Sequence, residues 1–309
     1  MRVFVAGASG AIGLPLVARL AERGHEVTGT TREENRARRV EALGARCAIC
    51  DVFDAAAVQD AVAAARPEVL IAQLTSLPER YDPRKIDYGP TNRVRVEGGG
   101  NLIAAAAQAG VRRVITQSIA FLYAPVGGAV KREDDPPFTE APEPFGTAVA
   151  AALEGERLFL DSGMEGLVLR YGWFYGPGTY YAADGNVAEE VRRRRFPIIG
   201  KGSGMFSFVH VEDAADATVA AVERGEPGVY NVCDDDPAPL REWLPEYAEA
   251  LGAKRPFRVP AWLARLLAGR FAAGMAIELR GASNAKAKRE LGWEPRFASW
   301  RQGFREALG

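Results

Sequence analysis

Cysteine and histidine are scarce in this chain, and their scarcity excludes two kinds of site. The sequence has 3 cysteines and 2 histidines, and an odd cysteine count in a long chain argues against a disulfide framework. Cys47 and Cys50 have the CxxC spacing of redox and zinc sites, but their segment reads as a strand. Residues three apart on a strand point to opposite faces. With only His25 and His210 besides, zinc has no credible ligand set, and we expect no metal.

Net charge and long apolar runs are lacking as well. Lys and Arg number 39 against 40 for Asp and Glu, so the chain has no broad basic field for nucleic acid or an anionic membrane. Apolar stretches stop well short of the roughly 20 residues that a membrane span needs. Met1 leads directly into an apolar strand and not into a signal peptide. We therefore expect a cytoplasmic protein without nucleic-acid or membrane partners.

What the chain does have is a regular alternation of short apolar segments with Ala- and Leu-rich helical stretches. Expected strands cover residues 3–7, 26–30, 46–50, 68–74, 113–118, 166–171 and 228–232. Expected helices cover residues 14–24, 34–44, 55–67, 101–111 and 150–163, and after a break near residue 175 also 187–195, 211–224, 240–251 and 261–267. This alternation is typical of an α/β fold with a doubly wound parallel sheet.

A glycine-rich turn follows the first expected strand. The glycines have GxxGxxG spacing: Gly7 would permit a tight turn, Gly10 a close approach of the backbone to a pyrophosphate, and Gly13 close packing of helix on strand. The following helix would present free N–H groups to the phosphates. A strand before the turn and a helix and second strand after it predict a nicotinamide-dinucleotide site. Its residues here are Gly7, Ser9, Gly10, Ala11, Ile12 and Gly13.

The end of the second strand indicates which cofactor is preferred. An NAD site usually has Asp or Glu there, whereas this chain has Thr30, Thr31 and Arg32. Arg32 can bind a 2′-phosphate while the Thr31 hydroxyl donates to it, and Arg36 is a weaker second contact. We predict NADP in preference to NAD, with NAD left open.

With this segment identified, the chain resembles the extended short-chain dehydrogenase/reductase superfamily, the group of NAD-dependent epimerase/dehydratases. The motifs LRYGWFYGPGT, FSFVHVEDAADA and RGASNAKAKRELGWEP occur in the family's order along nearly the whole chain. The resemblance implies a Rossmann-type domain over residues 1–175 with a return segment at about 207–233. It implies a smaller, interwoven substrate region at 176–206 and 234–309, and a homodimer built on residues 98–109 and 148–160. It also implies cofactor contacts by Asp51, Val52, Ala72, Gln73, Leu74 and Asn92.

The family's proton relay is missing from the corresponding positions. The family uses Ser or Thr with Tyr-x-x-x-Lys, and the similarity of EPFGTAV to the family's SPYGKSK puts Phe145 at the Tyr and Val149 at the Lys. Neither carries a titratable proton. Ser118, next to the expected Ser/Thr position, and Tyr123, just past the fifth strand, are the candidate catalytic residues. The alternatives are packing under the adjacent loop for Tyr123 and a hydrogen bond to the backbone for Ser118.

Residues for substrate binding are less defined. Tyr175 in the YGPG turn, Tyr180 and Tyr181 in the next loop, and Arg280 are candidates, with packing, exposure or a salt bridge as their alternatives. Trp173 and neighbouring aromatics suggest an apolar substrate wall. We expect an NADP(H)-dependent oxidoreductase that acts on a small-molecule carbonyl or alcohol. The alternatives are a nucleotide-sugar epimerase or dehydratase and a non-catalytic NADP-sensing protein.

Overall fold

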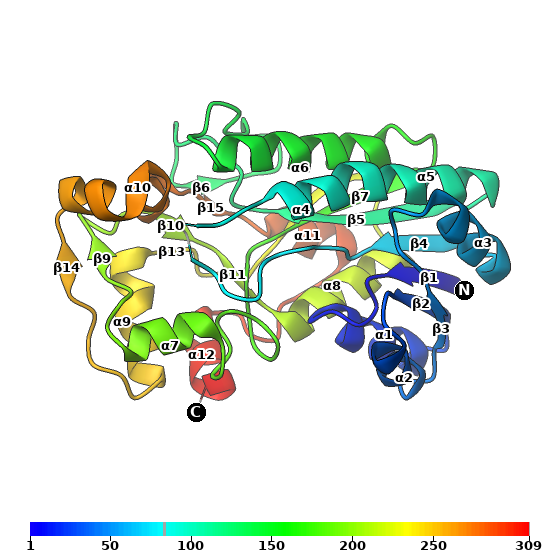
Figure 1. The fold of residues 1–309 in the computed structure, drawn as a ribbon, viewed down its shortest axis with the longest axis horizontal. Coiled ribbons are helices and arrows are strands. Elements are labelled where there is room, and N and C mark those ends of the chain that lie inside the picture. Colours follow the sequence, from blue (N-terminus) through cyan, green and yellow to red (C-terminus); the bar gives the residue numbers. More distant parts are fainter. Residues whose placement is uncertain (83–84, 309) are drawn as a thin grey trace.

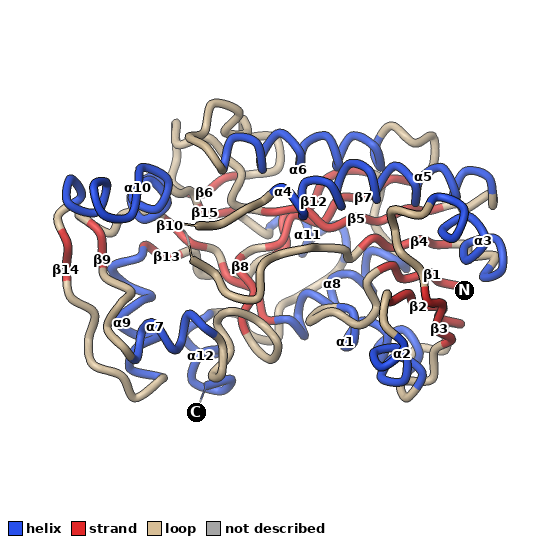
Figure 2. The backbone as a smooth tube through the Cα atoms, in the orientation of Figure 1, coloured by secondary structure: helices blue, strands red, loops and turns tan. Residues whose placement is uncertain are grey.

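The computed structural model describes residues 1–82 and 85–308 and has a seven-stranded parallel sheet at its centre. Each pair of neighbouring strands in this sheet is parallel. In sheet order the strands are β3 (Arg46–Ile49), β2 (Glu26–Thr31), β1 (Arg2–Ala6), β4 (Val69–Ala72), β5 (Arg113–Ile119), β7 (Glu165–Tyr171) and β12 (Gly228–Val232). Every strand expected from the sequence overlaps one of these (Figure 2), so the predicted Rossmann-type α/β fold is confirmed.

Helices cover both faces of the sheet (Figure 1). On one face lie α1 (Gly13–Glu22), α2 (Glu34–Glu41) and α8 (Val211–Glu223); on the other lie α3 (Ala55–Ala65), α5 (Gly99–Gln108) and α6 (Phe145–Leu160). A short helix α4 (Gly89–Arg93) and a π-helical turn (Val94–Gly98) lead into α5, while α11 (Ala285–Leu291) packs on α8 and β12. The central strands are buried on both faces, which is why they read as continuous apolar runs.

Helix α6 shows how the sequence sets the orientation of a helix. Phe145, Val149, Ala152, Glu156 and Phe159 are all buried and recur every three or four residues. This spacing forms one stripe on an α-helix, so the stripe faces the sheet. The stripe is apolar except at Glu156, which brings a carboxylate into the core.

The remaining elements form an outer region on the left of Figure 1. Its short strands pair as β8 (Trp173–Tyr175) with β11 (Phe208–His210), β9 (Ile198–Ile199) with β14 (Arg258–Val259), β10 (Met205–Phe206) with β13 (Ala238–Pro239), and β6 (Val130–Lys131) with β15 (Gly281–Ala282). Its helices are α7 (Asn186–Arg192), α9 (Leu240–Ala250), α10 (Ala261–Glu278) and α12 (Trp300–Leu308). Aromatic side chains such as Phe208, Trp243 and Phe304 form a second core here.

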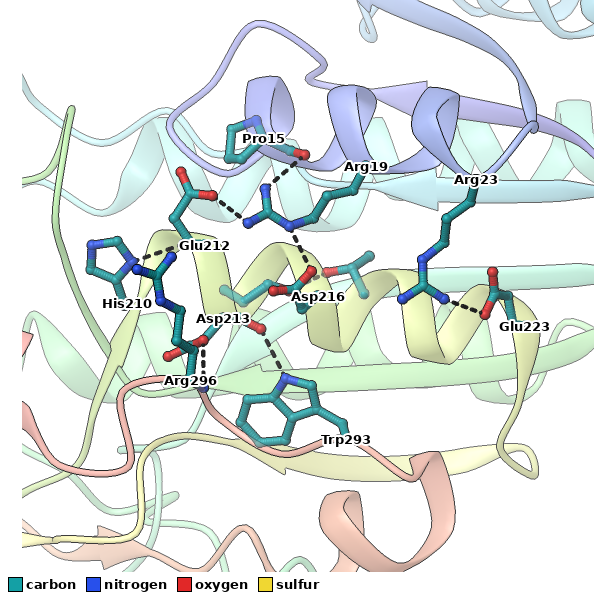
Figure 3. A network of polar contacts seen from close by, with 12 residues as sticks. Pro15, Arg19, Arg23, His210, Glu212, Asp213, Asp216, Glu223, Trp293 and Arg296 are labelled. Atoms are coloured by element: carbon teal, nitrogen blue, oxygen red, sulfur yellow. Dashed lines mark hydrogen bonds and ion pairs between the residues drawn. The ribbon is translucent and has the colours of Figure 1, made fainter.

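A polar network ties α1 to late parts of the chain (Figure 3). Arg19 of α1 forms ion pairs with Glu212 and Asp216 of α8, the latter at 2.5 Å. The Nδ1 atom of His210 accepts the Glu212 backbone N–H at 3.2 Å and so caps α8. Asp213 accepts the backbone N–H of Arg296 at 2.9 Å. The first helix is thereby held in place relative to the outer region.

None of the helices in the described part of the chain is long and apolar enough to cross a membrane.

Candidate functional site

The turn between β1 and α1 can be built only with glycine at two positions. Gly7 has a φ of +87°, and a Cβ there would lie 2.3 Å from the Gln73 carbonyl oxygen. A Cβ on Gly13 would lie 2.2 Å from the Gly7 carbonyl oxygen. Helix α1 starts at Gly13 without a side-chain cap. The Leu14 N–H donates to the Gly10 carbonyl oxygen at 3.1 Å, whereas the N–H groups just before it, up to Gly13, have no acceptor among the described residues and are available to an anion. The geometry is that of a phosphate cradle.

A cavity opens at the carboxyl ends of β1 to β4, and most of the predicted cofactor residues line it. They come from successive strand ends: Gly7, Ser9 and Gly10 after β1, Thr31, Arg32 and Arg36 after β2, Asp51 and Val52 after β3, and Gln73 and Leu74 after β4. The Ser9 hydroxyl donates to the Thr31 hydroxyl at 3.2 Å and ties the first two groups together. Residues distant in sequence therefore share one site.

The other predicted cofactor residues lie around this cavity without lining it. Ala11 and Ile12 complete the turn before α1, and a Cβ on Gly178 would lie 3.5 Å from the Ala11 side chain, so the loop after β8 passes over the turn. Ala72 is buried at the end of β4. Asn92 lies in α4, where its Oδ1 is buried and accepts no hydrogen bond from the described residues. The roles assigned to them from the sequence stay predictions.

A charged residue at the end of β2, Glu33, was not among the residues predicted for the site. Glu33 lines the cavity, and its carboxylate lies 3.2 Å from the Arg36 guanidinium. Arg36 thus has an anionic partner already. Arg32 also lines the cavity and is exposed, and it forms no ion pair or hydrogen bond with the residues that the structure describes. Because Glu33 directly follows Arg32 in the sequence, its position could have identified it as a residue of the same site.

A second cavity lies between the start of α6 and α10, and aromatic rings dominate its walls. The lining residues with rings are Phe121, Tyr123, Phe138, Phe145 and Phe271. The rings of Phe145 and Phe271 are 5.7 Å apart, and the Phe121 ring stacks at 4.3 Å on Trp173. Trp173, which the sequence suggested for an apolar substrate wall, does not itself line the cavity, and the role of the wall in substrate binding stays a prediction. The contribution of α10 was not foreseen.

Ser118 and Tyr123, the two candidate catalytic residues, belong to one buried network. The Ser118 hydroxyl donates to Glu156 at 2.6 Å. Arg170 donates to both oxygens of Glu156, at 2.8 and 2.6 Å, and to the Tyr123 hydroxyl at 3.0 Å. Tyr123 in turn donates to Asn231 at 2.7 Å. Both hydroxyl groups are therefore already hydrogen-bonded within the protein.

The electrostatics of this network make Tyr123 a poor proton donor. Burial raises the pKa of Tyr123 to about 12, although the neighbouring Arg170 guanidinium acts in the opposite direction. Burial lowers the pKa of Arg170, but its hydrogen bonds and ion pair with Glu156 outweigh this and leave the pKa raised. The structure brings the two candidate catalytic residues together, and their catalytic role stays a prediction.

The predicted substrate residues line neither of the two cavities. Tyr175 and Tyr181 are buried in the aromatic core of the outer region, where burial raises the pKa of both. Tyr180 donates its hydroxyl to the Pro78 carbonyl oxygen. The Arg280 guanidinium donates to the Pro125 carbonyl oxygen at 2.8 Å and so fixes a loop. These contacts give the four residues structural partners, and their assignment to substrate binding stays a prediction.

Comparison with known proteins identifies relatives along the whole chain. The model of the NAD dependent epimerase/dehydratase family matches residues 3–233. A Streptomyces protein named 3-diazoavenalumate denitrifying reductase is 47% identical over 305 residues, which cover 98% of this chain and 99% of that protein. A Stigmatella aurantiaca protein named 4-hydroxy-2-methyl-3-oxo-4-farnesyl-3,4-dihydroquinoline-1-oxide ketoreductase is 28% identical over 258 residues, or 82% of this chain and 74% of that protein.

Solved structures with the same fold carry nicotinamide cofactors. The UDP-glucose 4-epimerase of Thermus thermophilus, solved with NAD, superposes with a TM-score of 0.76 at 26% identity and covers 100% of this chain and 98% of its own. A human epimerase family protein solved with NADPH has a TM-score of 0.75 at 22% identity and covers 100% of this chain and 99% of its own. At this identity, the likeness to the human protein shows that the two chains share a fold and shows nothing further.

Proposed function

The chain belongs to the NAD dependent epimerase/dehydratase family, and we propose that it is a reductase that passes hydride from a nicotinamide dinucleotide to an aromatic diazo compound, with release of dinitrogen. The observation that carries the proposal is the start of α6, where Phe145 lines the aromatic cavity and Val149 follows it in the core. The 47% identity to a protein named as a diazo-compound denitrifying reductase supports it.

The first cavity fits the cofactor. The glycine cradle and the uncapped start of α1 would hold the pyrophosphate, and Asp51 and Val52 would contact the adenosine. The buried Oδ1 atom of Asn92, without a partner among the described residues, offers one further acceptor nearby. When bound, the reduced nicotinamide would supply a hydride, that is, one hydrogen with two electrons.

The preference for NADPH over NADH rests on Arg32. Its exposed guanidinium lines the cavity without an anionic partner in the described structure, so a ribose 2′-phosphate would complete its hydrogen bonding. The nearby carboxylate of Glu33 would oppose a phosphate, but its ion pair with Arg36 offsets the charge. The preference for NADPH therefore depends mainly on Arg32, with Arg36 as the second arginine of the site.

The chemistry of diazo reduction matches a site that lacks the family's proton donor. Hydride addition to a carbonyl leaves an alkoxide, which needs a proton from a side chain such as tyrosine. An arenediazonium ion needs none. A C–H bond forms with the hydride electron pair, the C–N bond breaks, and its electrons leave with N₂. A cation and a hydride thus give a neutral arene and dinitrogen, and the atoms and charges balance. Phe145 and Val149 suit this reaction because neither has a proton to give.

The residues of the aromatic cavity would bind and orient the substrate ring. Phe145 and Phe271 line the cavity, are nearly fully buried and have ring centroids 5.7 Å apart, so a substrate ring would pack against them. Ring faces are negative and attract a cation such as a diazonium group. The same rings would exclude water, which competes with hydride for an arenediazonium ion.

Carbonyl reduction is the second candidate, favoured by the ketoreductase among the relatives. In that reaction Ser118 or Tyr123 would have to release a hydrogen bond of the buried network in order to donate a proton. We also propose a homodimer, as the family resemblance implies, with α5 and α6 at the interface. A monomer mass by light scattering at micromolar concentration would exclude it.

The test follows deuterium from the cofactor. NADPH deuterated at the transferred position is incubated with benzenediazonium and the enzyme, and the product is analysed by mass spectrometry against an enzyme-free control. We expect deuterated benzene, with the label at the carbon that carried nitrogen. Unlabelled product at the rate of the control overturns the proposal, and tight NADPH binding without turnover of diazo or carbonyl compounds would indicate a sensor.

A double variant separates the two candidate reactions. Phe145→Tyr with Val149→Lys restores the family's proton donor and the cation that lowers its pKa. We expect the variant to gain ketone reduction while its diazo reduction does not rise. A rise in diazo reduction would mean that proton donation limits that reaction, contrary to the proposal.

A further inference from the structure

We propose that the aromatic cavity selects substrates that carry a carboxylate, and that Arg265 and Arg270 of α10 bind this group at the cavity mouth. The inference deepens the proposed function, because it rests on the aromatic cavity as the substrate site. It adds the substrate class, an aromatic carboxylic acid, and two residues that determine specificity.

The two ends of the cavity differ in polarity. Phe145 and Phe271 are buried to more than nine-tenths, whereas Arg265 and Arg270 are exposed lining residues. An elongated ligand would thus have its ring packed against the phenyl groups and its far end at the guanidinium groups. A planar guanidinium binds a carboxylate through two parallel hydrogen bonds, a geometry that a lysine cannot supply.

Both arginines lack partners within the described residues. Many arginines elsewhere on the surface have a carboxylate within ion-pair distance, for example Arg93 with Glu97 at 2.6 Å. No such pair or hydrogen bond involves Arg265 or Arg270 in the part of the chain that the structure describes. One acid, Glu278, lines the same cavity, so two positive charges face one negative charge there. The lining of the cavity therefore carries a net positive charge, which the carboxylate of a ligand would neutralise.

A break in α10 brings the two arginines to the same cavity. Residues five positions apart on a continuous helix point about 140° away from each other, because each residue turns the helix by about 100°. Gly269, between the two arginines, has a φ of 85° and a ψ of 167°, which no helix contains. Arg265 therefore comes from the first half of α10 and Arg270 from the second, and both line the cavity.

The second half of α10 also leaves room for the ligand. Gly274 lines the cavity, and a Cβ built there would meet only the Glu278 carboxylate, at 3.8 Å. An added Cβ therefore meets no backbone atom outside this helix, and we expect a leucine side chain to reduce the space for a ligand. Gly274→Leu therefore tests whether a ligand binds in this cavity.

The experiment measures binding, so that it does not depend on the reaction. Titration calorimetry of the NADP-loaded protein compares trans-cinnamate with trans-cinnamamide, its uncharged analogue. We expect the acid to bind at least about tenfold more tightly than the amide, because only the acid forms charge-assisted hydrogen bonds. Gly274→Leu should weaken both ligands. Arg265→Gln with Arg270→Gln should bring the acid down to the affinity of the amide.

A matched variant controls for general charge effects. Arg255 is exposed in the loop between α9 and β14 and lines neither cavity, so Arg255→Gln should keep the preference for the acid. Equal binding of acid and amide by the wild-type protein, or a preference that survives in the double variant, overturns the inference. Selective acid binding without diazo reduction would refute the proposed function alone, and diazo reduction without acid selectivity would refute this inference alone.

Discussion

Replacing Glu156 by glutamine is the sharpest test of how the candidate site is built. Its carboxylate lies at the centre of the buried network and pairs with Arg170 at 2.6 Å, with side-chain exposures of 4% and 7%. Glutamine keeps the shape but removes the negative charge, and it offers a donor to Arg170 where an acceptor stood. Removal of one partner from a buried ion pair costs about 3–5 kcal/mol. We expect the free energy of unfolding to fall by about 3 kcal/mol, because the remaining amide oxygen still accepts one hydrogen bond.

A control for this prediction lies on the same helix. Glu154 pairs with Arg157 at 2.5 Å, but their side chains are 42% and 65% exposed, so Glu154→Gln should cost less than about 0.5 kcal/mol. Urea unfolding followed by circular dichroism measures both variants, with the requirement that the slope against urea stays constant. If the two variants differ by less than about 1 kcal/mol, the network does not carry the stability assigned to it here.

Further predictions address the cofactor, the proposed chemistry and the acid response. Arg32→Ala should weaken NADPH binding at least about tenfold in calorimetry and leave NADH unchanged, and an equal loss for both would refute the 2′-phosphate assignment. Gly7→Ala should lower both stability and cofactor affinity, since its Cβ would meet the Gln73 carbonyl oxygen at 2.3 Å; wild-type binding would contradict the cradle. Tyr123→Phe should cost about 1–2 kcal/mol of stability and leave diazo reduction within about threefold, whereas loss of that activity at normal stability would identify Tyr123 as a proton donor. Burial lowers the pKa of His210 to about 4, so the folded protein resists a proton that the unfolded chain accepts below about pH 6.5. Stability should therefore fall between pH 6.5 and 4 by about 3 kcal/mol, and His210→Asn, which keeps the cap, should flatten this fall.

The sheet and the cofactor cradle could be predicted from the sequence because their causes are local. A strand buried on both faces must be apolar throughout, as β1 and β4 are. The glycines at positions 7 and 13 are required by backbone distances within one turn and to its neighbouring strand. The alternation of segments placed the start of α6 at residue 150, whereas the likeness of EPFGTAV to the family's SPYGKSK placed it earlier. The helix starts at Phe145, and the aromatic contacts of its first turn come from elsewhere in the chain.

The parts that escaped prediction depend on contacts between distant segments. Helix α10 was expected over 261–267 and runs to Glu278, because beyond the break at Gly269 its second half is hydrogen-bonded to the segment that leads into β10, where the Gly204 N–H donates to the Ala276 carbonyl oxygen at 2.9 Å. Nothing local indicated that this half would line a cavity with Phe145. Tyr181 lies in a segment that reads as a loop, yet it is buried against Trp243, some sixty positions later. Periodicity within a segment carries no information about such partners.

The arrangement along α6 links the missing proton relay to the proposed chemistry. At the cavity end of the helix stand Phe145 and Val149, and two turns further in stands Glu156, bonded to Arg170 and Ser118. The polar groups of this helix face thus lie deep in the core, where they hold β5, β7 and α6 together, and the cavity end is left apolar. For a carbonyl substrate this arrangement removes the proton that completes the reaction. For an arenediazonium ion it removes the water that would compete with hydride, and the ring faces stabilise the charge. On the proposed reaction, the substitutions that would disable a carbonyl reductase are therefore the ones that protect the substrate.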